Sequence, residues 1–199
     1  MEITGSIGRR NTIRFNNALP IPGEDLTYIP TPKCASSSGI EAITLKWPKL
    51  YKEIYHVDRI KTTYAVSMWR EPTERAWSAY KYTCARLPLH WSEWNDGKRY
   101  FPDTSVPWDE FLHEFARNSH RENLLLTLIP QNEFCKGTAK HIMVPWDFER
   151  LANILTVPEI LHSNPGKNPA PMPDITTEMQ FHLNIIYGAD YRIWELIQH

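Results

Sequence analysis

The sequence predicts an α/β domain built on a central, mostly parallel sheet that is flanked by helices. Short segments rich in β-branched and aromatic residues alternate with segments whose apolar residues repeat at helical spacing. This alternation is typical of strands that are joined by helical crossovers. The length of 199 residues and the apolar content of 42% predict a single domain that is large enough to bury a core.

Local composition predicts the first elements. Residues 1–24 contain few apolar residues and end in "LPIPGED", which predicts an irregular N-terminal arm. The segment 25–31, "DLTYIPT", predicts a short buried strand. Ser36 or Ser37 is a suitable N-cap for the helix that follows, because a short polar side chain accepts hydrogen bonds from the free N–H groups of a first helical turn.

Further strands are predicted where aromatic and β-branched residues gather, at 53–57 ("EIYHV"), 62–69 ("TTYAVSMW") and 141–145 ("HIMVP"). A helix is expected to begin at Pro72, since proline is favoured in the first helical turn. Residues 86–107, rich in aromatic residues and proline, are expected to form a long loop on the substrate side. The remaining helical patterns lie at 108–117, near 120–127, at 146–155 and in two segments that close the chain.

Composition and charge exclude several classes of protein. A net charge of -1 gives no overall positive field for nucleic acid or an acidic membrane, so any anion site must be local. The three cysteines, Cys34, Cys84 and Cys135, are odd in number and lack metal-ligand spacing, which favours reduced thiols. No segment approaches the roughly 20 apolar residues of a membrane-spanning helix, and the first residues lack the apolar core of a signal peptide. We therefore expect a cytoplasmic protein.

The stretch "PKCASSSG" joins the strand predicted at 25–31 to the next helix and has the composition of an anion site. Lys33 offers a full positive charge, Ser36, Ser37 and Ser38 offer hydroxyl donors, and a helix start presents free N–H groups. The simpler alternative is a capped helix beside a solvated lysine. An ATP-binding P-loop is disfavoured, because its lysine follows the glycines whereas Lys33 precedes the small residues.

A second stretch, "REPTERAWSAYK", follows the strand that ends in "SMW" and begins at Arg70. Carboxyl ends of parallel strands lie at one sheet edge, so this stretch is expected beside the first loop. Arg70, which has a guanidinium suited to bidentate binding, and Ser78 are expected to hold a second phosphate. The alternative is that Arg70 and Arg75 pair with Glu71 and Glu74 on a solvated helix end.

The two stretches resemble the cofactor motifs of sulfotransferases that use 3'-phosphoadenosine 5'-phosphosulfate (PAPS), and most closely those of the carbohydrate O-sulfotransferases. "PKCASSS" is similar to the first motif, Pro-Lys-x-Ala/Gly-Ser/Thr-Ser/Thr. The segments 130–151 and 185–195, together with "LHSNPGK", resemble later segments of the family, so the ordered set spans about residues 28–195. The second motif, Arg-Asp-Pro-x-x-Arg-x-x-Ser-x-Tyr, is matched at Arg70, Pro72, Arg75, Ser78 and Tyr80, with Glu71 for the aspartate.

The resemblance implies a P-loop-NTPase-like sulfotransferase fold and a PAPS-dependent O-sulfotransferase. Such an enzyme moves a sulfuryl group, in line, to a hydroxyl of an acceptor, for which a carbohydrate is the leading candidate, and leaves 3'-phosphoadenosine 5'-phosphate (PAP). Lys33 is the expected catalytic residue, because it can stabilise charge that develops on the leaving oxygen. No metal is expected. The cofactor-binding residues that the resemblance implies are Lys33, Cys34, Ala35, Ser36, Ser37 and Ser38 for the 5' side, and Arg70 and Ser78 for the 3'-phosphate.

In the family, a histidine or glutamate near the second strand acts as general base toward the acceptor hydroxyl, which implies His56 in this chain. Histidine has a pKa in the useful range, although a strand histidine can equally be satisfied by a neighbouring carbonyl group. The other candidates for this role are Glu41, Glu53, Asp58 and His90.

The residues leave two rival functions open: a P-loop-type nucleotide-binding kinase, and a non-catalytic domain of the same fold that binds a nucleotide or a glycan. Cys34 is either a reactive thiol activated by Lys33 or a packing residue. No basic or aromatic-basic motif indicates a nucleic-acid partner. A platform for a sugar ring and a small local core are the two interpretations of Trp91, Trp94, Tyr100, Phe101 and Trp108.

Overall fold

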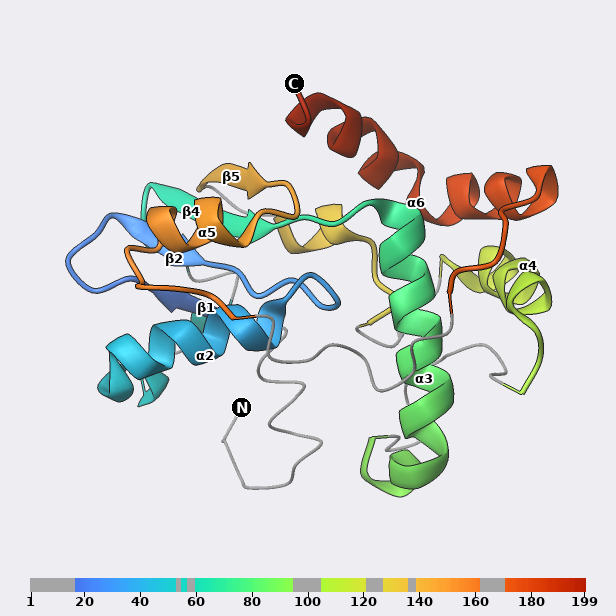
Figure 1. Cartoon of the computed structure of the whole chain (residues 1–199), viewed down its shortest axis with the longest axis horizontal. Coiled ribbons are helices and arrows are strands. Elements are labelled where there is room, and N and C mark those ends of the chain that lie inside the picture. Colours follow the sequence, from blue (N-terminus) through green and yellow to red (C-terminus); the bar gives the residue numbers. More distant parts are fainter. Residues whose placement is uncertain are drawn as a thin grey trace.

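A five-stranded sheet forms the centre of the α/β fold, and its strand order is β3-β1-β2-β4-β5 (Figure 1). β1 is antiparallel to β2 and β3, whereas β2, β4 and β5 are parallel neighbours, so four strands run in one direction. The computed structural model describes residues 17–52, 55–56, 60–94, 105–120, 127–135, 139–161 and 171–199. The strands are β1 (Asn17–Pro20), β2 (Leu26–Tyr28), β3 (Tyr55–His56), β4 (Tyr64–Met68) and β5 (Lys140–Val144).

Helices follow the parallel strands, as the alternation in the sequence predicts. The sequence also predicts two closing helical segments, and Tyr187 has non-helical angles (φ -121°, ψ 19°) that kink the last helix at that residue. The α-helices are α2 (Ser36–Lys46), α3 (Pro72–Trp94), α4 (Trp108–Asn118), α5 (Phe148–Ile154) and α6 (Thr177–Ile197), and the 3-10 helices are η1 (Pro48–Lys52) and η3 (Gln131–Cys135).

Side-chain alternation along the strands divides the sheet into two faces. On one face, Tyr28, Val66 and Val144 pack in a single apolar cluster with Ile43 of α2 and Leu151 of α5. On the other face, Ile29 and Ala65 pack against Phe134 of η3. The sheet is therefore covered on both sides, which is the usual setting of parallel strands.

A second apolar cluster joins the helices α3, α4 and α6, which lie together at one end of the molecule (Figure 1). Phe111 and Phe115 of α4 are buried in it, and Tyr187 contributes a fully buried ring at the kink of α6. The first turn of α6 is capped by Thr176, whose hydroxyl accepts a hydrogen bond from the N–H of Met179 at 3.2 Å. This helical layer holds α3, which begins directly after the end of β4, in place beside the sheet.

Three expectations about local structure are wrong. Residues 17–20, within the expected irregular arm, form β1 and pair with two strands. Residues 86–94 of the loop expected at 86–107 are helical, because α3 continues to Trp94 through Pro88, and residues 95–104 lie outside the described residues. A proline removes one helical hydrogen bond, which a long helix can tolerate. Ala35, rather than a serine, is the N-cap residue of α2, and no side chain caps that helix.

The remaining helix expectations are tested in part. The strand and helix predicted at 141–145 and 146–155 correspond to β5 and α5. Of the helical pattern near 120–127, residues 121–126 lie outside the described residues, and residues 127–128 form a turn. Among the helices of the described part of the chain, none combines the length and apolar character that crossing a membrane requires.

Candidate functional site

The two motif loops lie at the same edge of the sheet. β2 and β4 are parallel neighbours, with Tyr28 opposite Val66, and the chain leaves both strands at their carboxyl ends. The loop 31–35 follows β2 and leads into α2, while Arg70 follows β4 and leads into α3. The parallel pairing of β2 with β4, which was only an expectation from the sequence, thus brings the Lys33 loop and Arg70 to neighbouring strand ends.

The backbone of the first loop is shaped for an anion. Lys33 and Ala35 have positive φ angles of 64° and 54°, and Cys34 between them does not. Alternation of left-handed and ordinary backbone is typical of loops whose N–H groups bind anions, although the N–H of Cys34 itself donates to the carbonyl oxygen of Thr31 at 3.2 Å. The loop leads directly into α2, whose first N–H groups have no helical partner and carry the positive end of the helix dipole.

The three serines occupy different environments at the start of α2. Ser36 and Ser38 are buried, at 5% and 3% exposure, whereas Ser37 is exposed. None of them serves as the N-cap, and no side chain makes a capping hydrogen bond to the first turn of α2. Gly39, one turn further, allows α2 to approach β2, because a Cβ atom there would lie 2.4 Å from Oη of Tyr28.

The surroundings of Lys33 disfavour its charged form. Its ammonium group lies 4.3 Å from the centre of the Tyr82 ring on α3. Burial, together with the nearby charges of Arg70 and Arg75, lowers the pKa of Lys33 to about 8. Lys33 is half-buried, and a lysine that is partly desolvated beside other cations is stabilised by any anion that reaches it.

Arg70 is fixed from two sides. Its Nε donates to Oε2 of Glu74 at 3.1 Å, which is one of the local pairs that the sequence left open. Its guanidinium carbon lies 4.8 Å from the centre of the Trp146 ring. The guanidinium of Arg70, whose side chain is 25% exposed, is therefore oriented before any ligand binds. Ser78, the other residue expected at the second phosphate, is half-buried two turns into α3.

Arg75, the other arginine of the second motif, is fully buried rather than solvated. Its Nε donates to the carbonyl oxygen of Pro32 at 3.0 Å, and its Nη2 donates to that of Ile129 at 2.6 Å. Pro32 immediately precedes Lys33, so Arg75 fixes the start of the anion loop from α3. The alternative in which Arg75 pairs with a glutamate on a solvated helix end is therefore wrong.

Gln131 of η3 joins the two loops. Its Oε1 accepts from Sγ of Cys34 at 2.8 Å and from the backbone N–H of Arg70 at 3.0 Å. Its Nε2 donates to the carbonyl oxygen of Arg70 at 2.9 Å. Sequence reasoning missed Gln131, because a single glutamine in "PQNEFCKG" gives no local sign of contacts with residues 61 and 97 positions away.

Asp190 of α6 holds Gln131 in turn. Its Oδ2 accepts from the N–H of Gln131 at 2.6 Å, and its Oδ1 accepts from the N–H of Asn132 at 2.9 Å. Burial raises the pKa of Asp190, and the charge of Arg75 together with these hydrogen bonds acts in the opposite direction. The motif segments 28–38, 70–80, 130–135 and 185–195 therefore meet in one hydrogen-bonded network.

Cys34 is a packing residue within this network. Its side chain is fully buried, and burial raises the pKa of its thiol to about 11. Because the thiolate is the reactive form, this environment disfavours the activated thiol that the sequence left as an alternative.

The expected general base lies at the same sheet edge. His56 ends β3 and pairs with Asn17 of β1, and β1 separates β3 from β2. Two strand spacings place its backbone roughly 10 Å from that of β2. Among the alternatives, Glu41 is exposed on α2, and His90 belongs to α3 rather than to a loop. Glu53 and Asp58 lie outside the described residues.

Trp108 belongs to a local core and not to an open platform. Its ring is 4% exposed and lies 5.3 Å from the ring of Trp77 and 5.8 Å from that of Phe111, between centroids. Trp91 and Trp94 are on α3, and Tyr100 and Phe101 lie outside the described residues. The alternative of a small aromatic core therefore holds for Trp108.

Comparisons with protein-family models, with curated proteins and with solved structures gave no match. The likeness to sulfotransferases accordingly rests on the motifs themselves and on the way in which the described residues bring them together.

Proposed function

We propose that this chain is a PAPS-dependent O-sulfotransferase with a P-loop-NTPase-like sulfotransferase fold. The observation that supports it best is the link through Gln131 between Cys34, which follows Lys33 in the first loop, and the backbone of Arg70. Two cationic loops on neighbouring strand ends, held by one side chain, suit a ligand with two anionic groups. PAPS is such a ligand, with a 5'-phosphosulfate and a 3'-phosphate.

The 5' side of the ligand would lie on the loop around Lys33. The N–H groups around the two positive-φ residues, Lys33 and Ala35, and the start of α2 would bind its oxygens. The 3'-phosphate would lie at Arg70, with Ser78 as a neighbouring donor. The preorganised guanidinium of Arg70, stacked on Trp146, supports this assignment, because little side-chain freedom remains to be lost on binding.

Lys33 acts on the reacting centre in this proposal. The donor supplies the sulfuryl group, and the bond between sulfur and the bridging oxygen breaks as the acceptor oxygen attacks. The ammonium of Lys33 stabilises the negative charge that grows on the bridging oxygen. It therefore stabilises the transition state more than the ground state, which lowers the barrier. The low pKa of Lys33 is consistent with this role, because an anion in the site would draw the group back to its charged form.

His56 is the proposed general base, and a carbohydrate hydroxyl is the proposed acceptor. β3 supports the first assignment, because it has the same direction as β2 and ends at the same sheet edge. The acceptor would approach from that edge, so that the base and the phosphosulfate lie on either side of the attacking hydroxyl.

Titration calorimetry with PAP tests the donor assignment. The wild-type chain is expected to bind PAP in the micromolar range, with ATP–Mg bound much more weakly. Lys33→Ala and Arg70→Ala should each weaken binding by tenfold or more. Lys49→Ala and Arg117→Ala, which remove exposed cations elsewhere, serve as matched controls and should leave affinity unchanged.

The rival functions give different results in the same experiment. A preference for ATP–Mg over PAP would refute the sulfotransferase proposal in favour of a kinase-like protein. PAP binding without sulfuryl transfer from PAPS to any member of a panel of sugars would indicate a non-catalytic nucleotide-binding domain.

A further inference from the structure

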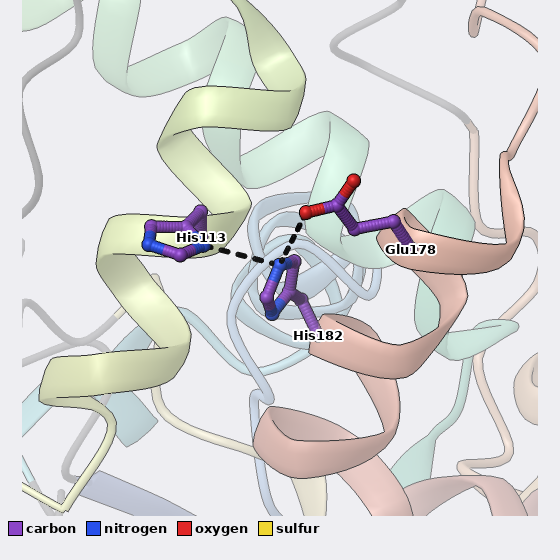
Figure 2. Close-up of side chains that lie close together, drawn as sticks. All are labelled: His113, Glu178 and His182. Atoms are coloured by element: carbon purple, nitrogen blue, oxygen red, sulfur yellow. Dashed lines mark hydrogen bonds and ion pairs between the residues drawn. The ribbon is translucent and has the colours of Figure 1, made fainter.

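A cluster of metal-ligating side chains lies between α4 and α6, on elements that carry neither the Lys33 loop nor Arg70. Nδ1 of His113 is 3.3 Å from Nε2 of His182, and Oε1 of Glu178 is 3.8 Å from the same Nε2 (Figure 2). One ligand atom from each of the three residues lies within 4.8 Å of the other two.

The helices place these three side chains on facing surfaces. Glu178 and His182 are four residues apart on the first half of α6, so they share one side of that helix, and His113 faces them from α4 (Figure 2). His182 is only 8% exposed, and its Nδ1 is buried without a hydrogen-bond partner among the described residues. The ring is therefore fixed by packing, with Nε2 as the nitrogen that meets the other two side chains.

The separation of the two imidazole nitrogens matches the coordination geometry of a small divalent ion. Two ligand atoms at about 2.0–2.1 Å from a tetrahedral zinc ion are about 3.3–3.4 Å apart. The two imidazole nitrogens already have this separation. The carboxylate of Glu178 has to move closer to the two imidazoles, because its Oε1 is 3.8 Å from Nε2 of His182 and the three ligand atoms lie within 4.8 Å of one another. Its side chain is 81% exposed, which allows this movement.

The surrounding charge also favours a cation. The cluster lines a cavity of about 480 Å³. The side chains that line this cavity include the carboxylates of Asp109, Glu110, Glu114 and Glu178, and none of the described residues that line it is a lysine or an arginine. A cavity lined by carboxylates attracts a cation and favours its retention.

We propose that His113, Glu178 and His182 bind a divalent transition-metal ion, with zinc as the best fit, and that this ion cross-links α4 to the first half of α6. Two imidazoles and one carboxylate form a donor set that zinc commonly uses, and they leave a fourth position for water or for a nearby carboxylate such as Asp109. This proposal does not depend on the sulfotransferase assignment.

Sequence alone does not indicate this site, and it predicted no metal. His113 and His182 are 69 residues apart, so no ligand spacing is visible along the chain. The packing of α4 against α6 creates the site.

Zinc titration of the chelator-treated full chain tests the proposal. We expect one zinc ion to bind, and the melting temperature to rise by about 5–10 °C at a free zinc concentration 100 times the Kd. His113→Gln and Glu178→Gln should each weaken zinc binding by about 100-fold or more, since loss of an outer-shell partner alone costs 10–100-fold. Both residues are exposed, so neither variant should disturb folding.

His120→Gln and Glu195→Gln are the matched controls, because both residues are exposed and lie outside the cluster. They should bind zinc as the wild type does. Substitution with Co²⁺ distinguishes this site from the cysteines, because nitrogen and oxygen ligands give visible bands without the near-ultraviolet band of a thiolate ligand. No zinc binding by the wild type, equal affinity in ligand and control variants, or a thiolate band that persists in His113→Gln would each overturn the proposal.

Discussion

Replacement of Gln131 by methionine tests whether this side chain holds the two anion loops together. Methionine has nearly the same length but cannot donate, and its thioether accepts only weakly. The change removes three hydrogen bonds of Gln131. Two are accepted from the thiol of Cys34 and the backbone N–H of Arg70, and one is donated to the carbonyl oxygen of Arg70. At about 1 kcal/mol for each bond, the expected loss in free energy of unfolding is about 3 kcal/mol.

Urea denaturation of the wild type and of Gln131→Met measures this loss, and the melting temperature should fall by about 6–12 °C. Gln198→Met, at an exposed position near the end of the chain, is the matched control and should change the free energy of unfolding by no more than about 0.5 kcal/mol. PAP affinity, measured well below the melting temperature, should fall about tenfold, because Arg70 is no longer held by its backbone.

A destabilisation of Gln131→Met below about 1 kcal/mol, equal to that of the control, would refute the inferred role of Gln131. If Gln131→Met lost about 3 kcal/mol of stability but bound PAP as the wild type does, Gln131 would support the fold without positioning Arg70 for the ligand.

Two further predictions concern Lys33 and α2. PAP binding should weaken as pH rises through about 8, because the ammonium of Lys33 loses its proton there. Lys33→Arg stays charged and should remove this dependence. The comparison is made between about pH 7.5 and about pH 9.5, where the phosphates of PAP are already ionised. A pH profile that is the same in both proteins would contradict it. Gly39→Ala should destabilise the protein by about 1–3 kcal/mol, because the new Cβ would meet the buried Tyr28 ring. Gly188→Ala on α6, where the nearest atom is 4.0 Å away, should instead stabilise it by about 0.5–1 kcal/mol, and denaturation curves that moved in the same direction for both would be evidence against this packing.

Local pattern predicted the main elements of the sheet. The β-branched and aromatic segments at 25–31, 62–69 and 141–145 contain β2, β4 and β5. Strand propensity and helical periodicity are properties of neighbouring residues, so they can be recognised along the chain. β1 escaped prediction, because its four residues, "NALP", contain no alternation long enough to identify a strand.

The anion loop could be anticipated in part. Lys33 and Arg70 were expected at one sheet edge because each follows the carboxyl end of a strand that was predicted to be parallel to the other. The roles of Arg75 and Gln131 could not be anticipated, since the carbonyl group of Pro32 is 43 residues from Arg75 and Cys34 is 97 from Gln131. Nothing local distinguishes a buried arginine from a solvated one in "REPTERAW".

The sequence by itself determined most of the strands and helices, though not β1 or the full length of α3, and it determined where the two cationic loops leave the sheet. These properties depend on short-range sterics and on the spacing of apolar side chains. Only the tertiary structure decided that Gln131 and Asp190 join those loops, and that His113 meets Glu178 and His182. Such contacts arise when helices and strands far apart in the chain bury their apolar faces together, and that packing then fixes which polar groups become neighbours.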